Sequence, residues 1–205
     1  MKLCQWTTHL VCAFVATLFA GCAMFRASTT DLDPNQPKHL TAKYDYTDLH
    51  ALTETLAKEF LATPLMTKQT EPPVLRLGAF QNRTQQHVDT QALGDRVRTL
   101  LIQSGKVQFV SEKQREELLK EQDYQAKNAA KGTQVAPGQQ LAPRFMMSGA
   151  LVEITRDSPR EVRLSRKEVS YYNLTIEVTD LQSGRIEWTA EKEIVRQASQ
   201  PLVGW

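Results

Sequence analysis

The chain has 205 residues, with 25 Lys and Arg against 23 Asp and Glu, and a formal net charge of +2. A surface that binds nucleic acid normally shows a basic face, and no block of one sign occurs in this sequence, so we expect no nucleic-acid partner. The hydrophobic content of 41% suffices for one core in a domain of roughly 150 residues with a tail. Because Cys4 and Cys12 precede Cys22 near the N-terminus, the part after Cys22 has no cysteine pair to oxidise.

The N-terminal segment has the layout of a secretory signal. Lys2 provides a short positive region, residues 10–19 are apolar, and small residues at 20 and 21 precede Cys22. The apolar run is too short for a bilayer core of about 30 Å, which takes roughly 20 helical residues. We therefore predict that residues 1–21 are a signal peptide.

Phe19-Ala20-Gly21-Cys22 resembles a bacterial lipobox, although lipoboxes favour Leu where Phe19 stands. The resemblance implies cleavage before Cys22, lipidation of Cys22 with chains such as palmitate, and a membrane anchor. Several acyl chains on one residue hold a protein far more firmly than a single chain. Ala23 after the cysteine favours the outer membrane by enterobacterial sorting rules. The alternative is an ordinary secreted protein cleaved near Ala20 or Ala23.

After the anchor, residues 22–46 are expected to be a lipidated N-terminus and a flexible linker, since they are polar and have no sustained apolar period. Fully extended, roughly 20 such residues span at most about 70 Å. The globular domain is expected at residues 47–197, followed by a loose tail at 198–205.

The first half of the domain predicts helices alternating with strands. Thr47 or Asp48 is a candidate N-cap for a helix that ends before Pro64. A strand at 74–80 is expected to end in a polar turn at 82–84. Asp89 or Thr90 is the candidate cap of a second helix, whose stripe is Leu93, Val97, Leu100 and Leu101, and Gly105 suits its left-handed C′ position. A short strand at 107–110 and a charged helix to about residue 127 follow; Ser111 and Gln114 match a capping box for that helix.

In the last third of the chain, apolar residues recur at every second position. Strands are expected at 145–155, 169–180 and 185–196, with a turn at 182–184. Alternation on adjacent strands indicates antiparallel pairs with one covered face. The expected fold is therefore α/β (α+β), with a single mixed sheet of about four to five strands packed by three helices.

Several segments, taken in order, resemble the LpoB family of outer-membrane lipoproteins, over about residues 46–196 and with the lipidated Cys22. They are Asn82-Arg83-Thr84, residues 87–90, 101–106, 147–151 and 180–188. The resemblance implies a compact domain like the N-terminal domain of TolB, without catalysis, which binds and activates a class A penicillin-binding protein, a peptidoglycan synthase. It also implies an outer-membrane location facing the periplasm, and we expect a monomer. The better-known members have a longer, Pro-rich tether.

Asn82, Arg83 and Thr84 are the candidate partner-binding residues. The guanidinium of Arg83 offers five donors in a rigid fork, and a turn after a strand would expose it. The alternative is a structural turn in which Asn82 bonds its local backbone and Arg83 pairs with a nearby carboxylate.

No other pattern points to chemistry. A catalytic His87–Asp89 pair needs a nucleophile, and the chain has neither a nucleophile-elbow Ser motif nor a spare Cys. The four histidines lack metal-ligand spacing, so we expect no catalytic residue, no metal and no cofactor. Glu116, Glu117 and Glu121 fit a solvated helix face better than the paired carboxylates of a wall-cutting glycosidase. Tyr171, Tyr172 and Trp188 are candidates for an aromatic binding platform. The alternative is that, on alternating strands, some of these side chains lie in the core and the others at a covered edge of the sheet.

A second hypothesis is an envelope-assembly or secretion lipoprotein of the CsgG-like type. A transmembrane barrel needs long strands with an apolar outer face, and Glu187, Glu191 and Glu193 count against one without excluding a ring in solution.

Overall fold

The computed structural model describes residues 41–136, 138–157 and 165–201. The predicted signal peptide, Cys22 and most of the predicted linker lie outside these residues. The described helices are α2 (Tyr46–Leu61), the single turn α3 (Pro64–Thr67), α4 (Thr90–Gln103) and α5 (Arg115–Asn128). The strands are β1 (Val74–Arg83), β2 (Gln108–Phe109), β3 (Phe145–Asp157), β4 (Ser165–Asp180) and β5 (Ile186–Pro201).

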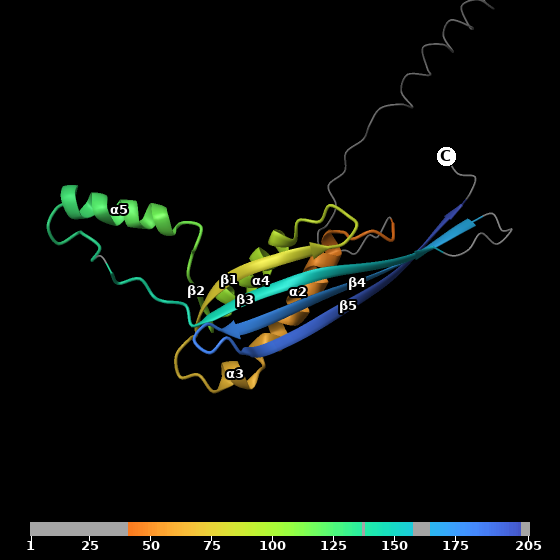
Figure 1. Ribbon diagram of the computed structural model, residues 1–205, viewed down its shortest axis with the longest axis horizontal. Helices are drawn as coiled ribbons and strands as arrows, with labels where there is room; N and C mark the ends of the chain where they lie inside the picture. The colour runs from red at the N-terminus through yellow and green to blue at the C-terminus, as the bar shows by residue number, and fades with distance from the viewer. Residues whose placement is uncertain (1–40, 137, 158–164, 202–205) are drawn as a thin grey trace, which may run out of the picture. The chain divides into compact units, whose positions relative to one another are not determined.

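The five strands form one mixed sheet in the order β2-β1-β3-β4-β5. β1 runs parallel to both β2 and β3, whereas β3, β4 and β5 form an antiparallel meander. Helices α2 and α4 lie on the same side of the sheet, behind it in Figure 1, and their apolar side chains join the core. This arrangement confirms the predicted mixed α+β fold.

The core lies between these two helices and one face of the sheet. The helical periods place Leu52, Leu56 and Phe60 of α2, and Leu93, Val97 and Leu101 of α4, against the strands. In β4 the predicted alternation is confirmed, because Tyr172, Leu174, Ile176 and Val178 are all fully buried. At about 25 cal/mol per Å² of apolar surface, these side chains supply the main stabilisation of the domain.

The N-terminus of α2 differs from the prediction. The N-cap is Asp45, whose carboxylate accepts bonds from the backbone N–H groups of Thr47 and Asp48, while the carboxylate of Asp48 accepts from the backbone of Asp45. Asp48 is therefore the N3 partner in a capping box and not the cap. The domain also packs from an earlier residue than expected, since Ala42 is buried.

Strand β1 is longer than predicted. It continues to Arg83 because residues 81–83 pair with residues 150–152 of β3, so Asn82 and Arg83 are strand residues and only Thr84 begins the turn. A bulge between Leu77 and Phe80 shifts the register there.

Helix α4 begins after its predicted cap Asp89, which accepts from Gln91 and Ala92, and Gly105 has the expected positive φ of 70°. The capping box predicted for α5 is wrong: α5 starts after Gln114, which makes no side-chain cap bond. Ser111 lies farther upstream, where Glu112 pairs with Arg76 of β1. None of the residues of α5 is buried, so α5 adds nothing to the core.

Strand β5 extends to Pro201, so the first residues of the expected tail belong to the sheet; residues 202–205 lie outside the described part. Among the described residues, no helix has the length and hydropathy needed to cross a membrane.

Candidate functional site

Of the three predicted contact residues, Asn82 and Thr84 make local hydrogen bonds that hold the turn after β1, whereas Arg83 does not. The Asn82 side chain donates to the carbonyls of Gln86 (2.9 Å) and Val88 (3.1 Å) and accepts from the Thr84 backbone (2.9 Å). Asn82 therefore closes the turn after β1, which is the structural alternative weighed for it. Its further role in binding remains a prediction.

Arg83 is exposed, and its guanidinium donates to the Gln81 side chain at 3.0 and 2.7 Å. It makes no ion pair within the described part of the chain, so the expected pairing with a nearby carboxylate is absent there. A guanidinium held by an uncharged neighbour keeps its charge available to a partner. Its role as a contact remains a prediction.

Arg83 lies at one edge of the sheet face that α2 and α4 leave uncovered, which we call the open face. In register, Arg83 of β1 lies beside Val152 of β3, Asn173 of β4 and Glu193 of β5. The next position along the strands brings Ile154, Tyr171 and Val195 side by side. We call Ile154, Tyr171 and Val195 the apolar row.

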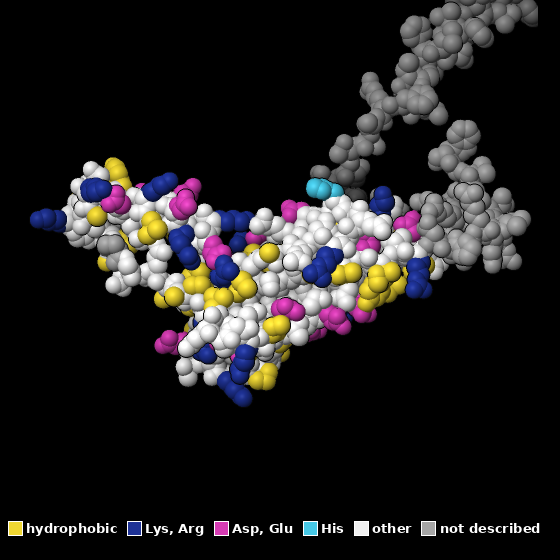
Figure 2. All heavy atoms as spheres, in the orientation of Figure 1, with side chains coloured by type: hydrophobic (Ala, Val, Ile, Leu, Met, Phe, Trp, Pro, Cys, Tyr) yellow, Lys and Arg dark blue, Asp and Glu magenta, His cyan; other side chains and the backbone are white. Residues whose placement is uncertain are grey.

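The apolar row is unusually accessible for such side chains, because Ile154 is 53% and Val195 66% exposed. Figure 2 views the open face and shows hydrophobic side chains gathered over the ends of β3, β4 and β5. Isolated exposed apolar side chains are ordinary, whereas contiguous ones mark interaction sites. Sequence reasoning missed this row, since its members stand on the polar phase of three strands and only the register brings them together.

The open face is divided by charge. Glu177, Glu191 and Glu193 lie on β4 and β5, where Figure 2 shows a line of acidic side chains. Arg83 and Arg156 lie on the other side of the face, on β1 and β3. Glu191 accepts from Asn173 at 3.1 Å. A hydrogen bond to Glu193 raises the pKa of the Tyr171 hydroxyl. Within the described residues none of these three carboxylates has a cationic partner.

A polar network fixes the turn after β1 to the sheet on the helix side. Gln86 donates to Glu153 (2.7 Å) and to the hydroxyl of Tyr172 (2.6 Å), and Tyr172 donates to Glu153 (3.2 Å). Partial burial acts to raise the pKa of Glu153, but bonds from Gln86, Thr155 and the Gln85 backbone outweigh it and leave that pKa below its usual value. The network is fully partnered and contains no nucleophile, so its role is structural.

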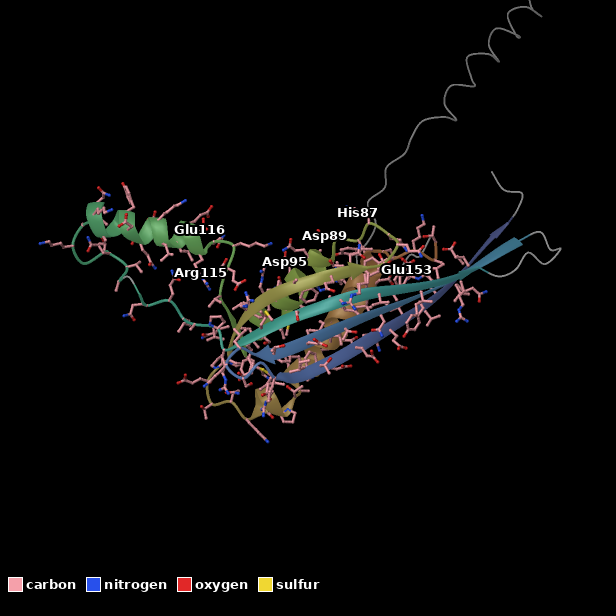
Figure 3. All side chains as sticks on the ribbon, viewed as in Figure 1. His87, Asp89, Asp95, Arg115, Glu116 and Glu153 are labelled. Atoms are coloured by element: carbon pink, nitrogen blue, oxygen red, sulfur yellow. The ribbon has the colours of Figure 1, made fainter. Side chains whose placement is uncertain are left out.

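The other candidates do not assemble into a reactive centre. Asp89 is engaged in capping α4, and His87 is exposed on the preceding turn (Figure 3). No group of three His, Cys, Asp or Glu residues with metal-binding geometry occurs in the described ranges. Glu116, Glu117 and Glu121 are exposed on α5, as a solvated face requires.

The aromatic platform does not form. Tyr172 is buried in the core, where it meets Tyr44 edge-on. Trp188 packs against Phe60 with ring centroids 5.1 Å apart. Tyr171 lies alone of the three on the open face, because alternate residues of a strand face opposite sides.

Comparisons with known proteins identify a matching family and several similar structures. Residues 48–194 match the family model described as "Peptidoglycan-synthase activator LpoB". No curated protein matches the sequence. Among solved structures, the chain is similar to the LpoB C-terminal domains from Salmonella enterica and Escherichia coli, with TM-scores of 0.44 and 0.43, 15% identity, and coverage of 72% of this chain and 98% of each of those.

A third similar structure is the lipoprotein GNA1162 from Neisseria meningitidis, with a TM-score of 0.36 and 14% identity over 62% of this chain and 85% of that one. The family assignment rests on the sequence match, because these identities and TM-scores are too low to support it.

Proposed function

Since the chain belongs to the LpoB family of peptidoglycan-synthase activators, we propose that it is a non-enzymatic outer-membrane lipoprotein that binds and activates a class A penicillin-binding protein in the periplasm. Lipid on Cys22 anchors it to the membrane, and the domain that begins near Ala42 is the binding unit. The observation that carries the proposal is the family match, which spans residues 48–194 and so includes both packed helices and almost the whole sheet.

An activator without chemistry of its own works through binding energy. It shifts the synthase toward an active conformation by no more than its preference for that conformation over the inactive one. A tenfold change in the active population takes about 1.4 kcal/mol of such preference. A single well-packed contact surface on this domain is sufficient for an effect of that size.

The proposed tether limits where the synthase must be. Roughly 20 residues before the domain span at most about 70 Å when fully extended, and a flexible chain of that length has a root-mean-square span of about 25 Å. The partner's binding domain must therefore project to within about 70 Å of the anchoring membrane.

Binding is tested with residues 23–205, which omit only the predicted signal and lipidated cysteine. Isothermal titration calorimetry against the purified periplasmic part of each class A synthase of the same organism should give saturable one-to-one binding to at least one of them. The absence of binding to all of them would contradict the proposal.

The state of assembly is tested on the same sample. Light scattering should report a monomer, as expected for an activator. A large closed ring would instead favour the envelope-assembly hypothesis.

A further inference from the structure

We propose that the synthase is bound on the open face, at the end formed by the apolar row, by a surface that presents an apolar side chain flanked by Lys or Arg. This inference rests on the proposed function and deepens it, because it names the binding surface and the chemistry of its partner.

The geometry of the apolar row suits a recognition site. Ile154, Tyr171 and Val195 are directly opposed on neighbouring strands, and opposed residues have Cβ atoms about 4.5–5.5 Å apart. The three side chains therefore form one continuous strip across the meander. Val152, one position along β3 on the same face, extends the strip toward Arg83.

The buried side chains of β4 hold the strip rigidly. Between the exposed positions of β4, the residues Tyr172 and Leu174 are completely buried against the helices. Alternation thus fixes the backbone of β4 through its buried side chains while it presents Tyr171 outward. A preorganised surface loses little conformational entropy on binding, and tyrosine is among the residues enriched at the energetic centres of interfaces.

Charge determines the occupant. Glu193 lies next to Val195 along the open face of β5, and Glu191 follows it. Neither carboxylate has a cationic partner in the described chain, so a partner with Lys or Arg at these positions gains complementary contacts. Arg83 on β1 and Arg156, next to Ile154 on β3, add two positions where a carboxylate of the partner is favoured. The two signs on opposite sides of the face define one orientation of docking.

A second copy of this chain is the less suitable occupant. Among the described residues of the open face, three carboxylates outnumber the two guanidiniums without a carboxylate partner, those of Arg83 and Arg156, since Arg76 is already paired with Glu112. Two copies placed face to face would bring two net-negative surfaces together, and like charges in an interface disfavour association.

The test compares paired substitutions on one strand face. Ile154→Thr with Val195→Thr removes the outer two members of the row and retains β-branched side chains that suit strands. The matched control is Ile186→Thr, because Ile186 is 55% exposed on the open face of β5, nine residues and so about 30 Å from Val195. Thermal unfolding of residues 23–205 establishes that each variant is folded.

We expect the double variant to raise the dissociation constant for the synthase at least tenfold and the control to change it less than twofold. Glu191→Gln with Glu193→Gln should weaken binding about threefold at low salt and reduce the salt dependence of the affinity.

Three failures are distinguishable. If the unaltered chain binds and the double variant binds equally well, the site is wrong while the proposed function stands. If the unaltered chain binds no class A synthase of the organism, the proposed function fails and the site falls with it. A dimer that the double variant dissolves would assign the face to self-association.

Discussion

Replacing Arg196 by methionine should destabilise the domain strongly, because its guanidinium joins the last strand to the start of the first packed helix. One terminal nitrogen donates to the Lys43 carbonyl (3.0 Å) and to the carboxylates of Asp45 (3.1 Å) and Asp48 (3.0 Å), and the other pairs with Asp48. The Arg196 side chain is 10% exposed and that of Asp48 only 2%.

The magnitude follows from what the substitution leaves behind. Asp48 keeps the bond from the Asp45 backbone at 2.9 Å but loses its buried counter-charge. Breaking a buried ion pair from one side costs about 3–5 kcal/mol. Because Asp45 is 30% exposed, water reaches part of the cluster, and we expect the low end, about 3 kcal/mol. For a domain of this size that lowers Tm by about 6–12 °C.

The assay is urea unfolding followed by far-ultraviolet circular dichroism. Arg196→Lys keeps the charge but loses the planar fork, so it should fall between wild type and Arg196→Met. In the Asp48→Asn background the additional cost of Arg196→Met should shrink by at least 1 kcal/mol, since the two groups are coupled. A loss below about 1 kcal/mol for Arg196→Met would show that Asp48 does not depend on this ion pair.

Three further predictions concern the polar network, the packing and the anchor. Hydrogen-bond donors lower the pKa of Glu153. The stability that its carboxylate contributes is therefore present above the unfolded pKa of about 4.3 and is lost as the pH falls through the lower folded value. Glu153→Gln should flatten the dependence of the unfolding free energy on pH between about pH 5 and 3, and an unchanged slope would contradict this. The three atoms nearest to a Cβ on Gly94 belong to the Phe80 and Leu77 side chains, whereas a Cβ on Gly149 lies 2.8 Å from both the Phe80 ring and the Thr175 carbonyl oxygen. Each Gly→Ala change should cost about 1–3 kcal/mol, and Phe80→Leu should relieve the first but not the second. Cys22→Ala should abolish labelling by radioactive palmitate and release the protein from membranes, and persistent label would show that another residue is acylated.

The sequence predicted the elements whose apolar period matches their burial. The α4 stripe and the alternation of β4 were both correct, since burial of one face requires that spacing whatever the neighbouring element is. The N-cap of α2 was predicted at Thr47 or Asp48, two or three residues late, because Asp45, Thr47 and Asp48 all suit a cap and only the reciprocal bonds decide between them. Ser111 and Gln114 matched a capping box by spacing alone, and the Arg76–Glu112 contact lies outside what local sequence encodes.

On the open face the sequence singled out Arg83, and Tyr171 only as part of an aromatic platform. Arg83 was expected to be exposed in a turn, and it is exposed as the last residue of β1. The apolar row depends on the register of three strands, which a single sequence does not determine. Ile154 and Val195 looked like isolated apolar residues on the polar phase of their strands, and only their pairing through Tyr171 makes them one surface.

Activation is measured as the initial rate of glycan polymerisation by the cognate class A synthase, recorded while residues 23–205 are titrated to saturation. We expect the rate to rise severalfold to a plateau near one chain per synthase, with the heat-unfolded chain inactive. A rate that stays at its basal value while the chain is fully bound would contradict this expectation.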